Sequence, residues 1–176
     1  KFTENGIRTI ILGRDREKLV MAKKLLGPLC EEIQSDLDQL STLPGLVNDI
    51  QNRFGPVTIL VNNAGVNLKK EFTEVTDQEF QQIMLTNVSA VFTLSREITK
   101  KMLETGNGSI INISSMASRY GIPKVIAYTA SKSAIEGMTR SMAVDLSPHG
   151  IRVNCIAPGF IETEMSSKAL NGDQDR

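Results

Sequence analysis

Three polar side chains in the second half of the chain have the types that proton transfer requires. Tyr128 and Lys132 are four residues apart in a stretch with helical spacing (127–146), so on a helix they project from the same face. A tyrosine phenol has a pKa of about 10, and a neighbouring ammonium favours the phenolate and lowers that pKa. Ser115 follows a strand-like run and could hydrogen-bond a substrate oxygen beside the phenol. Together the three groups would move a proton on or off an alcohol or carbonyl oxygen.

The same residues also allow a structural interpretation, and other chemistries find little support. Lys132 could extend its charge into water while Tyr128 packs with its hydroxyl hydrogen-bonded. His149 is the only histidine and stands in the loop SPHGI, where we expect a solvated turn residue, so neither a metal centre nor a Ser–His hydrolase is predicted. Cys30 and Cys155 have no CxxC spacing, and Cys155 lies in an apolar run that predicts a buried, reduced thiol.

Composition indicates one globular domain covering residues 1–176. The chain has 20 basic and 20 acidic residues, a formal net charge of zero, and 40% hydrophobic residues. This balance argues against nucleic acid or a membrane surface as a partner. No apolar run approaches the roughly 20 residues of a membrane span, and the start of the chain lacks the apolar core of a secretory signal. We therefore expect a cytoplasmic protein.

Strand-like and helical segments alternate along the chain, and Thr76 with Glu79 predicts a capping box at the start of one helix. The pattern predicts strands at 7–13, 29–36, 57–65, 108–115 and 151–159, and helices at 15–27 (ending at Gly27), 40–55, 76–104 and 126–147. This alternation favours a doubly wound parallel sheet, a Rossmann-like three-layer α/β/α fold. Because ligands bind at the carboxyl ends of parallel strands, the polar or glycine-rich segments after the five strands predict one shared site.

Several motifs resemble those of the short-chain dehydrogenase/reductase family in order and spacing. They are NNAG (62–65), Asn87 within a long helix, INISS (111–115), YTASK (128–132) and RVNCIAPGFIETEM (152–165), and the resemblance covers essentially the whole chain. It implies a catalytic tetrad of Asn87, Ser115, Tyr128 and Lys132. In this tetrad Tyr128 is the general acid/base and Ser115 orients the substrate carbonyl. Lys132 lowers the pKa of Tyr128 and binds the nicotinamide ribose, and Asn87 supports a water that leads protons to Lys132. Without the family pattern, a mid-helix asparagine would be interpreted as capping or bending its helix.

The resemblance also implies a nicotinamide cofactor. Beyond Tyr128 and Lys132, it is expected to contact Asn63, Ala64 and Gly65 on its adenosine half, Asp36 and Leu37 near the adenine, and Pro158, Gly159, Ile161 and Thr163 at the nicotinamide end. Arg14 favours NADP, because a guanidinium pairs well with the 2′-phosphate. Asp15 would instead favour NAD if it turned inward. No metal is expected.

Two parts of the family pattern have no counterpart in this sequence. The first strand with its glycine-rich turn precedes residue 1, and the last helix and strand would follow residue 176. We therefore expect a domain truncated at both ends, either a fragment or a sequence from which unobserved segments have been left out. A complete polypeptide of this length would bind the cofactor weakly and have poor stability.

The leading functional hypothesis is an NADP-dependent oxidoreductase that interconverts a carbonyl and a secondary alcohol, resembling the 3-oxoacyl-[acyl-carrier-protein] reductases of fatty acid biosynthesis. Apolar residues such as Met116 and Ile122 favour an acyl substrate, whereas Arg119 and Lys124 could meet a carboxylate or phosphate. A gluconate or polyol dehydrogenase is therefore the alternative within the family. A non-catalytic dinucleotide-binding module or an inactive fragment is the alternative from another class. The resemblance further implies a homodimer or homotetramer formed through helices 76–104 and 126–147.

Overall fold

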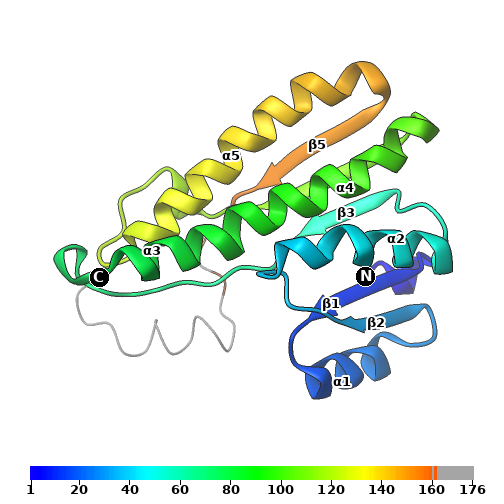
Figure 1. Ribbon diagram of the computed structural model, residues 1–176, viewed down its shortest axis with the longest axis horizontal. Helices are drawn as coiled ribbons and strands as arrows, with labels where there is room; N and C mark the ends of the chain where they lie inside the picture. Colours follow the sequence, from blue (N-terminus) through cyan, green and yellow to red (C-terminus); the bar gives the residue numbers. More distant parts are fainter. Residues whose placement is uncertain (160, 162–176) are drawn as a thin grey trace. The chain divides into compact units, whose positions relative to one another are not determined.

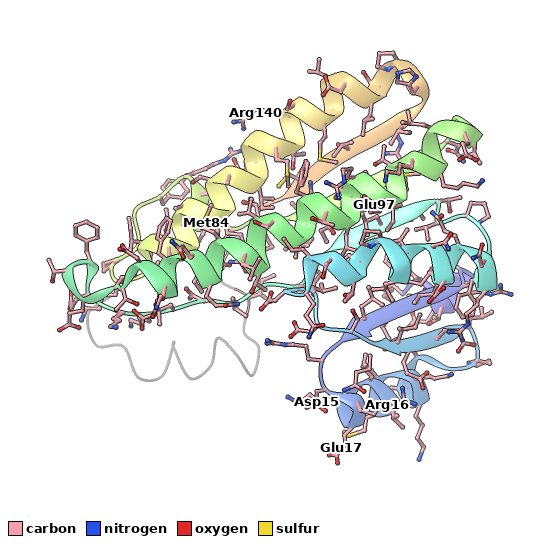
Figure 2. The ribbon with its side chains drawn as sticks, in the orientation of Figure 1. Asp15, Arg16, Glu17, Met84, Glu97 and Arg140 are labelled. Carbon is pink, nitrogen blue, oxygen red and sulfur yellow. The ribbon has the colours of Figure 1, made fainter. Side chains whose placement is uncertain are left out.

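The computed structural model describes residues 1–159 and 161, which form two compact units that are described separately. The first unit, Lys1–Ser41, contains strand β1 (Thr9–Gly13), helix α1 (Arg16–Leu26) and strand β2 (Cys30–Gln34), with a short 3₁₀ turn at Thr3–Asn5 before them. A further 3₁₀ turn, Leu40–Thr42, spans the boundary between the two units in the chain. The two strands pair in parallel (Figure 1). Helix α1 begins at the capping side chain of Asp15, seen with its neighbours in Figure 2, and ends at Gly27 with φ +84°, which confirms the predicted cap.

The second unit, which starts at Thr42, holds a three-stranded parallel sheet and the helices that cover it. Its elements are α2 (Leu43–Phe54), β3 (Ile59–Asn62), a 3₁₀ turn (Phe72–Glu74), α3 (Asp77–Met84), a π-helical turn (Leu85–Ser89), α4 (Ala90–Thr105), β4 (Gly108–Ile113), a 3₁₀ turn (Met116–Ser118), α5 (Ile126–Leu146), a 3₁₀ turn (Ser147–His149) and β5 (Ile151–Ile156). The strands lie in the order β3-β4-β5, with β4 paired in parallel to both neighbours. Parallel strands joined by helices are the arrangement that the sequence predicts.

Helices α4 and α5 pack on the sheet, and α2 packs beside α4 (Figure 1). Strand β5 shows the consequence, since Ile151 and Val153 are buried whereas Arg152 and Asn154 are exposed. Its side chains therefore alternate between the face that α5 covers and the opposite face, more clearly than the sequence predicts. Within the part of the chain that the structure describes, no helix is both long and apolar enough to cross a membrane.

A buried polar network holds these helices on the sheet. The side-chain amide of Asn62, at the end of β3, donates to the Ser95 hydroxyl of α4 (3.0 Å) and to Asn112 Oδ1 of β4 (2.8 Å). The Asn112 amide in turn donates to the Thr139 hydroxyl of α5 (2.9 Å), which donates to the Ile135 carbonyl (2.7 Å). Because these polar groups are buried, each needs a partner, and the network joins β3, β4, α4 and α5 through the bonds that supply those partners.

The predicted helix at 76–104 begins as expected but is not a single α-helix. Thr76 and Glu79 form the capping box, with the Thr76 N–H donating to Glu79 Oε2 (2.8 Å) and the Glu79 N–H to the Thr76 hydroxyl (3.2 Å). The π turn then separates α3 from α4 and contains Asn87 near its middle. Such a turn inserts an extra residue into the helix, which redirects the side chains around it, and π turns are frequent at functional sites.

The cysteines are both free thiols. Cys30 is fully buried and Cys155 is half-buried, so the prediction of a buried Cys155 is wrong in this respect. Cys155 lies on the same face of β5 as the buried Ile151 and Val153, but it is the next-to-last residue of the strand, where the burial along this face is no longer complete. His149 is exposed in the 3₁₀ turn after α5, as its loop sequence predicts.

Candidate active site

Lys132 is buried at the carboxyl end of a central strand. Its side chain comes from the second turn of α5, and the residue is only 5% exposed. The ammonium donates to the carbonyl oxygen of Ile113, the last residue of β4 (2.7 Å). Burial lowers the pKa of Lys132 below its ordinary value, because the charged ammonium loses contact with water, while Cys155 acts in the opposite direction. The alternative in which this lysine extends into water is therefore wrong.

Tyr128 lies beside that ammonium. The Lys132 nitrogen is 5.6 Å from the centroid of the phenol ring, and Tyr128 itself is half-buried at the start of α5. The structure thus brings the two side chains together on one helix face, as their spacing predicts. Ser131, in the next turn of α5, donates its hydroxyl hydrogen to the Tyr128 carbonyl oxygen (2.7 Å).

Ser115 stands in the loop that follows β4. Its hydroxyl accepts from the Ala117 N–H (3.2 Å) and so caps the short turn at Met116–Ser118. The Met116 N–H donates to the carbonyl of Pro158 (3.0 Å), which joins this loop to the loop after β5. Among the described residues, no hydrogen bond links the Ser115 hydroxyl to the Tyr128 phenol, so the two groups are each positioned by their own element.

Asn87 connects the π turn to two other segments of the site. It is 1% exposed, and its Oδ1 accepts from the Val66 N–H (2.8 Å). Its amide donates to the Val66 carbonyl (2.9 Å) and to the Ser131 hydroxyl (2.9 Å). A Cβ added at Gly65 would lie 3.3 Å from Asn87 Oδ1 and 3.5 Å from the Lys132 nitrogen, so the glycine allows this close approach. Asn87 therefore binds a distant segment rather than its own helix.

The predicted cofactor residues of the second unit line the carboxyl ends of β3 and β5. Those at these two strand ends that the structure describes are exposed or half-buried, so a ligand could reach them: Asn63, Ala64, Gly65, Pro158, Gly159 and Ile161. Thr163 lies outside the described residues. The structure thus places three of the five predicted strand ends at one edge of the β3-β4-β5 sheet.

The remaining cofactor residues belong to the first unit. Arg14 follows β1 and is exposed, while Asp36 and Leu37 follow β2 and are half-buried. The carboxylate of Asp15 is occupied at the start of α1, where Oδ1 accepts from the Lys18 N–H (3.1 Å) and Oδ2 lies 3.7 Å from the Lys18 ammonium. Asp15 is therefore a helix cap, an interpretation that the sequence analysis missed although an aspartate before a helix is a common capping signal.

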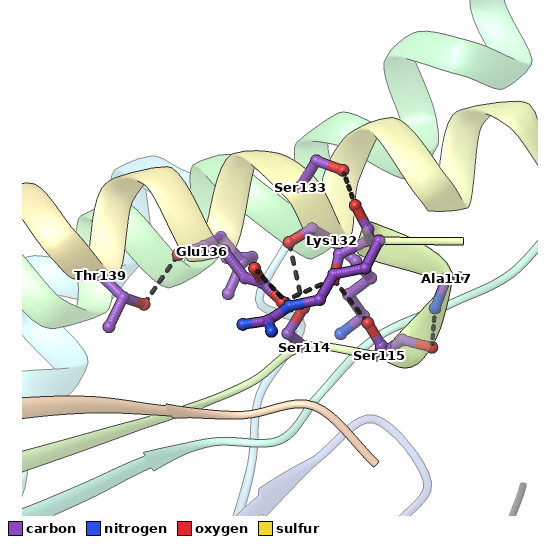
Figure 3. Close-up of polar contacts among 10 residues, drawn as sticks. Ser114, Ser115, Ala117, Lys132, Ser133, Glu136 and Thr139 are labelled. Atoms are coloured by element: carbon purple, nitrogen blue, oxygen red, sulfur yellow. Dashed lines mark hydrogen bonds and ion pairs between the residues drawn. The ribbon is translucent and has the colours of Figure 1, made fainter. Parts of the chain in front are cut away.

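Two further residues of this region escaped the sequence analysis. Ser131 bonds both Asn87 and Tyr128, and Glu136, one turn after Lys132, bonds the loop that carries Ser115 (Figure 3). Ser131 stands inside the motif YTASK, where attention to the small residues would have found it. For Glu136 the only sequence signal is its spacing of four residues from Lys132.

Taken together, these groups suit chemistry on an oxygen atom. A phenol at the edge of the sheet lies beside a buried ammonium, and a serine hydroxyl stands on the adjoining loop. The phenol can exchange a proton, the ammonium can stabilise the phenolate, and the hydroxyl can donate to a substrate oxygen.

Comparison with known proteins agrees with this geometry. The short chain dehydrogenase family matches residues 1–174. The chain is 39% identical over 170 residues to a 3alpha-hydroxysteroid dehydrogenase of Mediterraneibacter gnavus, covering 94% of this chain and 68% of the relative. It is 44% identical over 128 residues to the 5-keto-D-gluconate 5-reductase of Escherichia coli K12, covering 73% of this chain and 50% of the relative. A 3-oxoacyl-[acyl-carrier-protein] reductase of Vibrio cholerae is 38% identical over 173 residues, which are 98% of this chain and 70% of the relative.

Solved structures share the fold. A variant of an actinorhodin polyketide ketoreductase with NADPH superposes with a TM-score of 0.93 at 31% identity, covering 99% of this chain and 69% of the other. An NAD⁺-bound xylitol dehydrogenase superposes with a TM-score of 0.89 at 27% identity, covering 95% of this chain and 66% of the other. The chain spans between half and about two thirds of the length of several curated relatives that it matches. With its doubly wound α/β fold, its motifs and these matches, the chain belongs to the short-chain dehydrogenase/reductase family.

Proposed function

We propose that the protein is an NADP-dependent oxidoreductase that interconverts a carbonyl compound and a secondary alcohol, with Tyr128 as general acid/base. The observation that carries this proposal is the buried ammonium of Lys132 beside the Tyr128 ring, at the carboxyl end of β4. Keeping a charge out of water is costly, and a single bond to the Ile113 carbonyl is the contact that offsets this cost among the described residues. A function that uses the charge accounts for its position.

The roles of the other residues follow from their contacts. When bound, the nicotinamide cofactor supplies or accepts the hydride. Tyr128 exchanges the proton with the substrate oxygen, and the Lys132 ammonium stabilises the negative charge that develops on the phenol oxygen in the transition state. Ser115 donates to the same oxygen and holds the substrate in place. Asn87 fixes the Val66 backbone next to Gly65, so we assign it to the tetrad as the group that keeps the strand end and α5 in register.

The assignment of NADP rests on the first unit. Arg14 is exposed, whereas the neighbouring carboxylate of Asp15 is engaged in capping α1 and so is not free to select NAD. A guanidinium pairs strongly with a phosphate. Several structural neighbours, such as the polyketide ketoreductase, contain NADPH or NADP, while the xylitol dehydrogenase contains NAD⁺, which stays the alternative.

For the substrate we propose a 3-oxoacyl thioester. A cavity of about 220 Å³ lies between the loops near Lys70 and Lys124, with walls that include Phe72, Ile122 and Ile126. These walls suit an acyl chain, and both lysines are already paired, with Glu79 and Glu71 respectively. A gluconate or other sugar dehydrogenase is the second candidate, favoured by the 44% identity to the keto-gluconate reductase.

Three expectations about the whole protein stay predictions. We expect the two units to form one domain and the protein to be cytoplasmic. We also expect a homodimer or homotetramer through helices 76–104 and 126–147. Support for the oligomer comes from Phe92 on α4, which is 50% exposed, and from the exposed Val144 on α5.

The test uses the purified full-length protein and compares reduction of a 3-oxoacyl thioester with reduction of 5-ketogluconate, followed by the absorbance of NADPH. Tyr128→Phe is expected to abolish turnover and to leave NADPH binding largely unchanged, as measured by fluorescence titration. The matched control is Tyr120→Phe, because Tyr120 is the only other tyrosine and is 64% exposed. Turnover of Tyr128→Phe within a few-fold of the unsubstituted protein would refute the proton-transfer role. If NADPH does not bind at all, the protein is not the proposed enzyme.

A further inference from the structure

The Glu136 side chain hydrogen-bonds the loop that carries Ser115. Its carboxylate comes from α5, one turn after Lys132, and its side chain is only 13% exposed. Oε1 accepts from the Ser118 hydroxyl (2.5 Å) and from the Ser114 hydroxyl (3.3 Å), and Oε2 lies 3.5 Å from Arg119 Nε (Figure 3). One side chain therefore contacts residues on both sides of Ser115.

The same loop is held at further points along α5. The Ser118 hydroxyl also lies 2.7 Å from the Ser115 carbonyl, which in addition accepts from the Ser118 N–H (3.0 Å). The Ser114 hydroxyl lies 3.1 Å from the Lys132 carbonyl, and the Ser133 hydroxyl donates to the Ser118 carbonyl (3.1 Å). Because a hydroxyl has a single proton, Ser114 and Ser118 each share it between two acceptors. A charged acceptor binds more strongly than a carbonyl, so Glu136 orients both hydroxyls.

The charge of Glu136 matters for this arrangement. The hydrogen bond from Ser118 lowers the pKa of Glu136 below its ordinary value, and Arg119 and Ser114 act in the same direction, so the group is a carboxylate at neutral pH. A glutamine in its place would keep one acceptor oxygen but could present an amide N–H₂ toward Arg119, where donor would face donor. Both neutral replacements should therefore loosen the loop, alanine more than glutamine.

We infer that Glu136 is a positioning residue, which acts through Ser114 and Ser118 to aim the Ser115 hydroxyl at the substrate oxygen. This inference rests on the proposed function, in which Ser115 orients the carbonyl. Glu136 does not contact Ser115 itself; it binds Ser114 and Ser118, which stand on either side of Ser115 in the loop. A displacement of about 1 Å in such a group can cost about 100-fold in rate.

The experiment compares Glu136→Ala and Glu136→Gln with the control Glu32→Ala in the full-length protein. Glu32 is a matched carboxylate, also 13% exposed and paired with Lys23 (2.8 Å), but it lies on β2. Hydrogen exchange reports the loop directly, because the Ala117 and Ser118 N–H groups bond the hydroxyl and the carbonyl of Ser115. Faster exchange at these two amides is expected in both Glu136 variants and not in the control.

Turnover measurements test whether Glu136 affects catalysis through Ser115. Glu136→Ala should lower kcat about 10- to 100-fold with NADPH affinity changed less than about twofold. In a Ser115→Ala background the same substitution should lower kcat by no more than about twofold, because a group that acts through Ser115 has nothing left to position. A general structural role would instead reduce kcat equally in both backgrounds.

The outcomes separate the two proposals. Unchanged exchange at Ala117 and Ser118 would overturn the inference, whatever the activity. Faster exchange with unchanged kcat, or an equal loss in both backgrounds, would also overturn it while leaving the proposed function intact. Absence of turnover in the unsubstituted protein would overturn the proposed function, and the positioning role with it.

Discussion

Replacing Asn87 by alanine should destabilise the protein, because Asn87 hydrogen-bonds two other segments of the candidate site. The bonds that are lost set the size of the decrease in the free energy of unfolding. The substitution removes three hydrogen bonds of 2.8 to 2.9 Å, two to the Val66 backbone and one to Ser131. Each is worth about 1 kcal/mol net, and a buried partner left unpaired costs about 1–3 kcal/mol. Ser131 keeps a partner in the Tyr128 carbonyl, and Val66 is half-buried, so the lost bonds themselves account for about 3 kcal/mol and the unpaired Val66 groups for at most about 1 kcal/mol more. We expect a loss of about 3–4 kcal/mol in the free energy of unfolding, which is large for one substitution.

The assay is urea denaturation of the full-length protein, followed by circular dichroism. The described chain contains no tryptophan, so intrinsic tryptophan fluorescence from this part is not an option. Asn107→Ala is the control, because Asn107 is exposed in the connection between α4 and β4, and it should change the free energy of unfolding by less than about 0.5 kcal/mol. A loss below about 1 kcal/mol for Asn87→Ala would refute the reasoning, since the three bonds would then contribute nothing beyond what water provides.

Three other substitutions test separate features of the chain. Arg14→Ala should weaken NADPH about 10- to 100-fold and NADH much less, and equal losses in titrations with both cofactors would exclude the phosphate contact. Glu79→Gln should lower the thermal unfolding midpoint at neutral pH, because the bond from the Thr76 N–H and those from Lys70 hold the pKa of Glu79 at about 2 against 4.5 when unfolded. That difference should fade as the pH falls from about 4.5 toward 2, and a pH-independent difference would contradict it. Gly150→Ala should lower the free energy of unfolding by more than the roughly 1–2 kcal/mol that a left-handed alanine costs, because the new Cβ would overlap the carbonyl oxygen of Gly106. Gly6 has nearly the same φ but open space around it, so Gly6→Ala should lower the free energy of unfolding in urea melts by that amount only.

Local structure was open to prediction because it depends on neighbouring residues. The capping box of Thr76 and Glu79 and the helix end at Gly27 follow from residues three or fewer positions apart, and the structure confirms both. The shared face of Tyr128 and Lys132 follows from a spacing of four on a helix. The strands and helices lie where the sequence predicts them, apart from the π turn that interrupts the helix expected at 76–104. Boundaries moved: the run expected as a strand at 57–65 is paired only over Ile59–Asn62, since pairing needs a partner strand and not only apolar residues.

The long-range contacts of the site were decided by the tertiary structure alone. Asn87 finds its partner at Val66, and Glu136 finds its partners at Ser114 and Ser118, across separations that no helical or strand period relates. The burial of Lys132 against the end of β4 likewise depends on how α5 packs on the sheet. A sequence can nominate a phenol and an ammonium for proton transfer. Packing between segments far apart in the chain decides whether the Lys132 ammonium is shielded from water. The same packing decides which groups position Ser115.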